Sequence, residues 1–301
     1  MLIPTVHPQT HRPLAFGSGL NGEASAASAG GLSRWVLPSP PVVNEPGAPV
    51  LAATVHESGT PGLSPLPVVF LHGLVGLNDH WEPVVAKIRS SLRCVLFEMP
   101  LLKLKGEACS IQGVTALTEQ YLGERFGSKC ILVGNSFGGH VALRIALNRP
   151  DLVGGLILAG SSGIIEKSLV SDLQIRPTRA WLRRKIAELF FDESNMAEAD
   201  VDRAFAELSQ KTGSRAMVKL SRSARRDELR DRIGQLAVPT LIVWGRQDVV
   251  TPPEAAEGFA RLINGSRLEW LDRCGHVPMI EKTDAFAALM LDFIAKLPAR
   301  A

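Results

Sequence analysis

The chain has 301 residues, of which 46% are hydrophobic and 21% are charged, and this balance allows one large α/β domain with an inserted subdomain. The formal net charge of +3 is too small to indicate a nucleic-acid partner, and no interleaving of aromatic and basic residues supports one. No apolar run reaches membrane-spanning length, so we expect neither a nucleic acid nor a membrane as partner.

The N-terminal part of the chain predicts a tail followed by edge strands. Residues 1–31 are rich in Gly, Ala, Ser and Pro with almost no apolar periodicity, which predicts a poorly ordered tail. Two apolar runs come next, and proline-rich segments flank both of them. Because proline suits the edge of a sheet, we expect two antiparallel edge strands, Arg34–Leu37 and Val50–His56.

From Pro67 onward, short apolar runs alternate with helical patterns. This alternation predicts a mostly parallel central sheet with helices on both faces. The remaining strands are predicted at residues 67–71, 93–97, 129–133, 154–159, 240–244 and 267–271. Helices are predicted at residues 81–88, 114–126, 141–147, 253–262 and 283–297.

The alternation is interrupted after the sixth strand. Residues 163–233 show helical spacing and many charges but no strand signal, which predicts a helical lid inserted into a core of residues 32–162 and 234–301. Six basic residues occur between Leu208 and Asp227 without one acid. We expect a solvated helix face balanced by the acids from Asp227 onward; the alternative is a mild positive field that attracts anionic substrates.

The most informative stretch is Gly134-Asn135-Ser136-Phe137-Gly138, which lies between a predicted strand and a predicted helix. A serine between two such glycines is the G-x-S-x-G nucleophile elbow. Strand and helix backbones approach too closely there for side chains at the glycine positions. We therefore predict that the hydroxyl of Ser136 is held above the sheet as a nucleophile.

A serine hydroxyl needs a general base, and the base needs an orienting acid. His276 follows the last predicted strand, and Asp248 follows the strand before it. Loops at the carboxyl ends of parallel strands share one edge of the sheet, so Ser136, Asp248 and His276 are predicted to form a triad there. Asp272 is the alternative acid, but it precedes the loop of the base itself.

An oxyanion hole requires two N–H donors directed at the developing charge. We predict the backbone N–H groups of Phe137 and Leu74, the second from the loop after the strand 67–71. His72 lies in the same loop, and a role in shaping it is more consistent with a single-base mechanism than a catalytic role. His140, one turn along the elbow helix from Ser136, is expected to serve packing.

These motifs resemble the signatures of the α/β-hydrolase superfamily, in its usual order, between about Val50 and Leu297. The resemblance implies the α/β-hydrolase fold, a hydrolase activity, and no cofactor or metal. Haloalkane dehalogenases and epoxide hydrolases of this fold use aspartate as nucleophile, so Ser136 argues against both. The matching segments are Phe70–Gly73, Gly134–Gly139, Trp244–Asp248 and Cys274–His276.

Within the superfamily the chain is most similar to the carbon–carbon hydrolases that cleave ring-fission products of aromatic catabolism. That resemblance implies substrate contacts for Arg203, which would hold a carboxylate or enolate, and for Asn135 beside the nucleophile. It also places His72, Gly73 and Val277 at the substrate. The group usually has tryptophan where this chain has Val277, so ester hydrolysis is the broader expectation.

The sequence thus predicts a serine hydrolase that cleaves a small carboxylic ester. The alternative is a carbon–carbon hydrolase acting on a ring-fission dienoic acid, and a non-catalytic receptor of the same fold is a weaker alternative. The four cysteines lack metal-site or C-x-x-C spacing, which predicts reduced thiols and a cytoplasmic location. We expect a small-molecule substrate as partner, and a homo-oligomer is compatible with the sequence.

Overall fold

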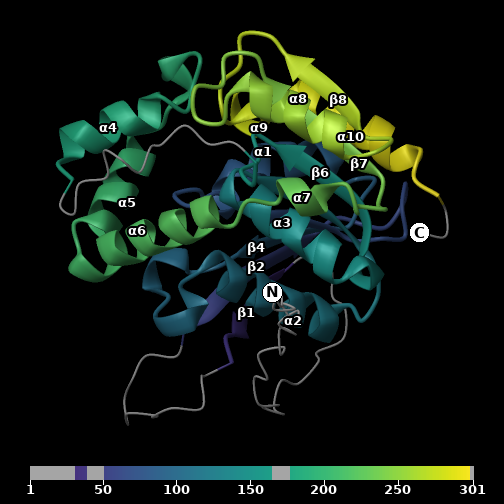
Figure 1. Cartoon of the computed structure of the whole chain (residues 1–301), viewed down its shortest axis with the longest axis horizontal. Helices are drawn as coiled ribbons and strands as arrows, with labels where there is room; N and C mark the ends of the chain where they lie inside the picture. The colour runs from purple at the N-terminus through teal and green to yellow at the C-terminus, as the bar shows by residue number, and fades with distance from the viewer. Residues whose placement is uncertain (1–30, 39–50, 165–176, 299–301) are drawn as a thin grey trace, which may run out of the picture.

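The fold is built on one eight-stranded sheet in the order β1-β2-β4-β3-β5-β6-β7-β8 (Figure 1). A computed structural model describes residues 31–38, 51–164 and 177–298. Strands β3 to β8 pair in parallel with their neighbours, whereas β2 pairs antiparallel with both β1 and β4. The strands are β1 Gly31–Val36, β2 Ala52–Ser58, β3 Val68–Leu71, β4 Cys94–Glu98, β5 Cys130–Asn135, β6 Val153–Ala159, β7 Thr240–Gly245 and β8 Arg267–Leu271.

Helices cover both faces of the sheet, as the alternation of the sequence predicts. Side chains of α2, α3 and α8 pack in one apolar cluster, and those of α1, α9 and α10 pack in another. Their bounds are α1 Glu82–Ile88, α2 Ile111–Arg125, α3 Phe137–Asn148, α8 Pro253–Leu262, α9 Pro278–Glu281 and α10 Thr283–Ala295. This arrangement confirms the predicted mostly parallel α/β fold.

The central strand β5 shows why the sequence reads as a continuous apolar run. Leu132 packs on the face with α3, whereas Ile131 and Val133 pack on the face with α1 and α10. Every residue of β5 is buried. A parallel strand covered on both faces needs apolar side chains at successive positions rather than at alternate ones.

Among the described residues between β6 and β7 lie four α-helices, which we call the cap together with the segments that join them: α4 Arg179–Ala187, α5 Glu198–Leu208, α6 Lys211–Arg226 and α7 Arg230–Ile233. Figure 1 shows α4, α5 and α6 grouped to one side of the sheet. A helical insertion after the sixth strand is therefore confirmed, although residues 165–176 lie outside the described residues. All six basic side chains of α6 are exposed, as expected for a solvated face.

The two N-terminal strands differ from their prediction in extent and position. Strand β1 begins at Gly31 rather than Arg34, because its pairing with β2 extends outward to Gly31 opposite Glu57. Of these two strands only β1 lies at an edge of the sheet, since β2 lies between β1 and β4. The rest of the predicted tail, residues 1–30, lies outside the described residues.

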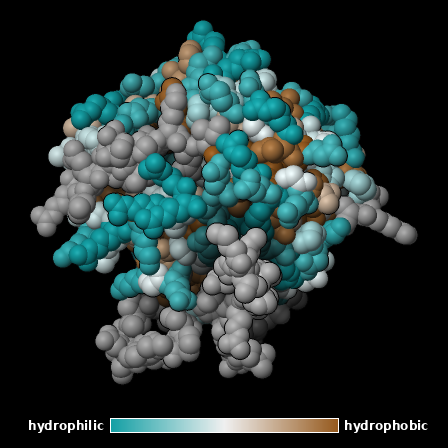
Figure 2. All heavy atoms as spheres, viewed as in Figure 1, coloured by the Kyte–Doolittle hydropathy of each residue, from teal (hydrophilic) through white to brown (hydrophobic). Residues whose placement is uncertain are grey.

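The surface is largely hydrophilic on the face drawn in Figure 2, apart from small apolar areas. Among the described residues, no helix combines the length and the apolar character needed to cross a bilayer. The four cysteines are buried and form no disulfide. Burial raises the pKa of the Cys274 thiol to about 12, so it is not a reactive thiolate at neutral pH.

Candidate active site

Ser136 lies in a strained turn between β5 and α3. Its backbone has φ 53° and ψ −119°, outside the regions that most side-chain-bearing residues adopt. A Cβ added to Gly134 would lie 2.5 Å from the carbonyl oxygen of Gly138, and one added to Gly138 would lie 2.3 Å from that of Leu71. The glycine pattern is thus a packing requirement, because no larger residue fits where β3, β5 and α3 meet.

His276 and Asp248 form a buried acid–base pair. Nδ1 of His276 lies 2.9 Å from Oδ2 of Asp248, and neither residue is more than 3% exposed. Oδ1 of Asp248 accepts hydrogen bonds from the backbone N–H groups of Val250 and Thr251, at 2.8 and 2.9 Å. Asp272, the alternative acid, is exposed and pairs with Arg246 at 2.7 Å instead.

Ser136 and His276 line one cavity of about 160 Å³ that is shared between the core and the cap. Most of its wall is apolar. The core contributes Gly73 to Gly76 and Val277, and the cap contributes Trp181, Leu182, Ile186, Leu189, Phe190 and Met217. Besides Ser136 and His276, the polar side chains in the wall are those of His80, Asn135, Lys185, Asp200 and Ser221. Ser136 and His276 therefore meet at one cavity, and Asp248 contacts His276 from outside it.

The predicted oxyanion loop stands directly beside the nucleophile. A Cβ added to Gly73 would lie 3.5 Å from Cβ of Ser136, and Leu74 lines the same cavity. Phe137 is the first residue of α3, so its N–H has no partner four residues earlier within the helix. Leu74 thus lies in the wall of the Ser136 cavity and Phe137 directly follows the nucleophile, while an oxyanion hole formed by their N–H groups stays a prediction.

His72 does not line the Ser136 cavity, so the structure does not support it as a substrate-binding residue. Its buried ring contacts the carbonyl oxygen of Gly73 through Nδ1 at 2.7 Å and accepts from the N–H of Met99 at Nε2, at 3.1 Å. A ring that donates at one nitrogen and accepts at the other is neutral. Burial also lowers the pKa of His72. These contacts join the loop after β3 to Met99, and a role of His72 in shaping this loop stays a prediction.

Arg203 likewise does not line the Ser136 cavity. Its guanidinium donates to Asp79 at 2.6 Å and to Asp200 at 2.5 Å, and it lines a second cavity of about 340 Å³ beyond the loop of Leu74 to Gly76. The contact with a substrate carboxylate that the resemblance implies is therefore not available in this arrangement.

Asn135 and Val277 do line the cavity, as predicted. The amide nitrogen of Asn135 donates to the carbonyl oxygens of Ala159 and His276, at 2.9 and 3.0 Å. This side chain consequently joins the strand of the nucleophile to the loop of the base. We conclude that positioning, rather than substrate binding, occupies its N–H groups.

Two further residues contact the triad but are not predicted from the sequence. The hydroxyl of Thr251 lies 2.8 Å from Oδ2 of Asp248, 3.0 Å from the carbonyl oxygen of Gly160 and 3.2 Å from Nδ1 of His276. A Cβ on Gly160 would come within 3.0 Å of that same Nδ1. A threonine three residues after the acid is a weak signal, and nothing in the sequence indicates Gly160.

Thr251→Val should lower kcat by about tenfold, because a hydrogen bond to a charged group contributes about 1.5–3 kcal/mol and part of it is recovered by relaxation. Valine keeps the shape of threonine and removes only the hydroxyl that contacts Asp248. Steady-state kinetics would measure the loss. Thr240→Val is the matched control, since the hydroxyl of the buried Thr240, the first residue of β7, donates to the carbonyl oxygen of Val238 just before the strand. Equal losses in both variants would contradict a special role for Thr251.

A parallel sheet, a serine in a tight strand-to-helix turn and a buried His–Asp pair at the carboxyl edge define the α/β-hydrolase class of enzymes. The model of the alpha/beta hydrolase family matches residues 68–289, so this chain belongs to that family and is a hydrolase.

Individual relatives include proteins named for ring-fission chemistry. The chain is 28% identical over 260 residues to "2-hydroxy-6-oxononadienedioate/2-hydroxy-6-oxononatrienedioate hydrolase 1" of Dechloromonas aromatica, covering 80% of this chain and 85% of the relative. It is 26% identical to monoacylglycerol lipase ABHD6 of Bos taurus, covering 79% and 78%. The structure of the meta-cleavage product hydrolase of Pseudomonas fluorescens IP01 superposes with a TM-score of 0.70 at 21% identity, covering 81% and 94%. The last likeness supports the fold alone, whereas the first confirms the predicted similarity to this group.

The described residues contain no group of three or more His, Cys, Asp or Glu side chains arranged to hold a metal ion.

Proposed function

We propose that this chain is a serine hydrolase in which Ser136 attacks a carbonyl carbon, His276 is the general base and Asp248 orients it. The observation that carries the proposal is the 2.9 Å contact of Asp248 with Nδ1 of His276, in a histidine that shares its cavity with Ser136. This contact keeps a proton on Nδ1, which leaves Nε2 to accept the proton of the serine hydroxyl.

The same groups serve both halves of the reaction. Ser136 adds to the carbonyl, and the N–H groups of Leu74 and Phe137 stabilise the oxyanion. His276 then passes the proton to the leaving group as the tetrahedral intermediate collapses to an acyl-enzyme. Water, deprotonated by His276, releases the acid and restores Ser136.

The names of the relatives favour a carbon–carbon bond as the one that is cleaved, rather than the ester that the sequence alone predicts. We therefore take a 2-hydroxy-6-oxo dienoic acid as the leading substrate class. Such a substrate must first ketonise, so that the carbon released from the carbonyl leaves as a stabilised carbanion and takes up a proton. The substrate is anionic, and Lys185 is the one lysine or arginine among the described residues of the cavity wall. Its ammonium also pairs with Glu188 at 2.9 Å, so a substrate carboxylate would share this cation with Glu188.

Ester hydrolysis is the second candidate, and the orientation of Arg203 favours it. With Arg203 held by Asp79 and Asp200 outside the cavity, no arginine meets a substrate carboxylate there. The wall is mainly aliphatic and aromatic, and Val277 follows the base. An apolar acyl group fits this wall without any cationic partner.

Lys185→Met should separate the two candidates. Methionine keeps the length and removes the charge, so kcat/KM for a dienoic acid should fall by about tenfold or more, while kcat/KM for a neutral p-nitrophenyl ester should change less than about threefold. The measurement is the loss of dienoate absorbance beside the release of p-nitrophenol. Arg203→Ala is the control and should affect either substrate by less than about tenfold.

Two results would change this proposal. Efficient ester hydrolysis by the wild type, with no turnover of the dienoic acid, would replace the leading candidate with the second. A dienoate rate that depends on Arg203 but not on Lys185 would show that the cap rearranges when substrate binds.

A further inference from the structure

Helix α6 connects the wall of the Ser136 cavity to the core. Met217 and Ser221 of α6 line the cavity. The neighbouring row of Ala216, Leu220 and Ala224 packs into the apolar cluster of α2 and α3. Side chains four residues apart lie on the same stripe of a helix, so the two rows form neighbouring stripes of α6. Because one helix carries both stripes, a shift of α6 on the core also moves the cavity wall.

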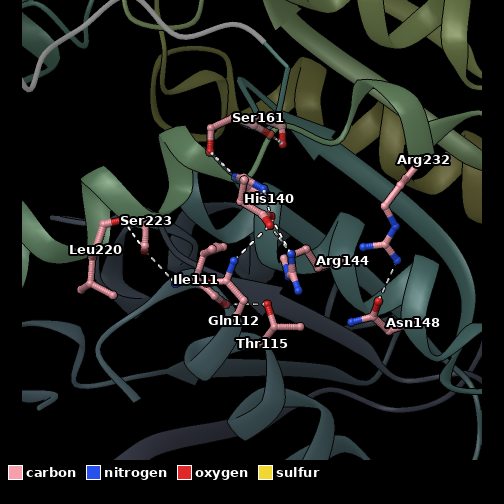
Figure 3. Close-up of polar contacts among 12 residues, drawn as sticks. Ile111, Gln112, Thr115, His140, Arg144, Asn148, Ser161, Leu220, Ser223 and Arg232 are labelled. Carbon is pink, nitrogen blue, oxygen red and sulfur yellow. Dashed lines mark hydrogen bonds and ion pairs between the residues drawn. The ribbon is translucent and has the colours of Figure 1, made fainter. Parts of the chain in front are cut away.

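Two polar contacts hold the C-terminal end of α6: the Ser223 hydroxyl accepts from the N–H of Ile111 in α2 at 2.9 Å, and the carboxylate of Asp227 binds α2 and α3. Arg144 of α3 donates to both of its oxygens, at 2.5 and 2.6 Å. Nε2 of His140, also on α3, lies 3.0 Å from Oδ2, and Gln112 of α2 donates to Oδ1 at 3.1 Å. Figure 3 shows His140, Arg144 and Gln112 converging at this point. Burial alone would raise the pKa of Asp227, but the bonds from His140 and Arg144 lower it to about 2, so the carboxylate is ionised.

His140 is also linked by hydrogen bonds to the backbone of Ser136. A carboxylate only accepts hydrogen bonds, so Nε2 of His140 carries a proton. The hydroxyl of Ser162 lies 3.4 Å from Nδ1 of His140 and 3.4 Å from the carbonyl oxygen of Ser136. The backbone N–H groups of His140 and Ser162 donate to that carbonyl, at 3.1 and 3.2 Å. His140 is completely buried, so these contacts are shielded from water.

We infer that His140, Arg144 and Asp227 form a latch that fixes α6 against the core and thereby sets the length of the acyl group that Ser136 accepts. These three are positioning residues and do not touch the substrate. The inference rests on the proposed function, because it requires Ser136 to react with acyl-like reagents. Breaking the latch leaves His140 and Arg144 without their shared anion, and the wall carrying Met217 and Ser221 then moves relative to Ser136.

The test compares two alkyl fluorophosphonates, one with a two-carbon and one with an eight-carbon chain, as reagents for Ser136. We expect Asp227→Ala to change the ratio of the two second-order labelling rates by about fivefold or more, and the rate for the short reagent by less than about twofold. Glu228→Gln is the matched control, because this neighbouring acid is exposed and pairs with Arg230 alone among the contacts described. It should leave the ratio unchanged.

A second measurement keeps the inference testable if Asp227→Ala does not fold. His140→Gln retains an N–H near the position of Nε2 and should keep the wild-type ratio, whereas His140→Leu should shift it in the same direction as loss of Asp227. Hydrogen exchange of the α6 amides should be about tenfold faster in His140→Leu, with β5 unchanged.

The possible failures are distinguishable. Absence of labelling in the wild type would contradict the proposed function itself. Labelling of the wild type with the same length ratio in His140→Leu, and with unchanged exchange in α6, would overturn the latch while leaving the proposed function intact.

Discussion

Replacing Ser136 with alanine should lower kcat by about a million-fold, with only the catalysis supplied by binding and the oxyanion hole remaining. The hydroxyl is the proposed attacking group, and no other residue can take its place at the turn. The fold should survive because the turn is held through the backbone. The N–H of Ser136 donates to Ala159, and the serine carbonyl accepts from His140 and Ser162. Alanine has a Cβ like serine, so the unusual φ costs no more than before.

Turnover and thermal unfolding, measured on the same preparation of Ser136→Ala, would check both halves of this expectation. Ser221→Ala is the matched control, since Ser221 is another serine in the wall of the same cavity. It should lose less than about tenfold, as for a packing or binding contact of about 1.4 kcal/mol. Residual activity of Ser136→Ala near that of Ser221→Ala would remove Ser136 from the mechanism.

The sheet and the positions of the proposed triad could be predicted because both depend on local rules. The glycines on either side of Ser136 indicate that neighbouring backbones lie too close for side chains, which one type of turn satisfies. Added Cβ atoms would lie only 2.5 and 2.3 Å from backbone oxygens. Asp248 and His276 follow parallel strands, and parallel strands bring their following loops to one edge. No long-range detail was needed for either inference.

The cap could not be predicted to the same depth, because a one-residue difference on a helix rotates a side chain by about 100°. Val201, Ala204 and Leu208 of α5 are buried. Asp200 lines the cavity of Ser136, but Arg203 lines the second cavity. Sequence resemblance placed Arg203 near the expected position along the chain, yet only the tertiary structure decides which side of α5 faces the nucleophile.

Contacts between segments far apart in the chain could not be predicted from the sequence either. The sequence predicts that Asp227 balances the basic face of α6, but its carboxylate instead contacts His140 and Arg144, more than eighty residues earlier. His140 was expected to pack on the helix face, and it is indeed buried, but its ring also bonds to the cap. A buried carboxylate requires partners, and the sequence does not indicate which ones the fold supplies.

Asp248→Asn should lower kcat by roughly ten-thousand-fold and leave KM nearly unchanged, as expected when the orienting carboxylate of a serine triad becomes an amide. KM should stay nearly unchanged because Asp248 is not among the residues that line the cavity. Asp272→Asn is the control, because this rival acid is exposed and paired with Arg246. A larger loss in Asp272→Asn than in Asp248→Asn would mean that the orienting acid is Asp272.

The size of the expected loss follows from the hydrogen bonds around Asp248. Oδ1 accepts from the N–H groups of Val250 and Thr251, so in the asparagine variant the amide oxygen must stay there. The amide NH₂ then takes the place of Oδ2 and faces Nδ1 of His276. Nδ1 must accept, which moves the ring proton to Nε2, and Nε2 can no longer take the proton of Ser136. Acylation, measured as the burst of p-nitrophenol or as the fluorophosphonate labelling rate, should therefore slow with kcat, while the melting temperature changes little.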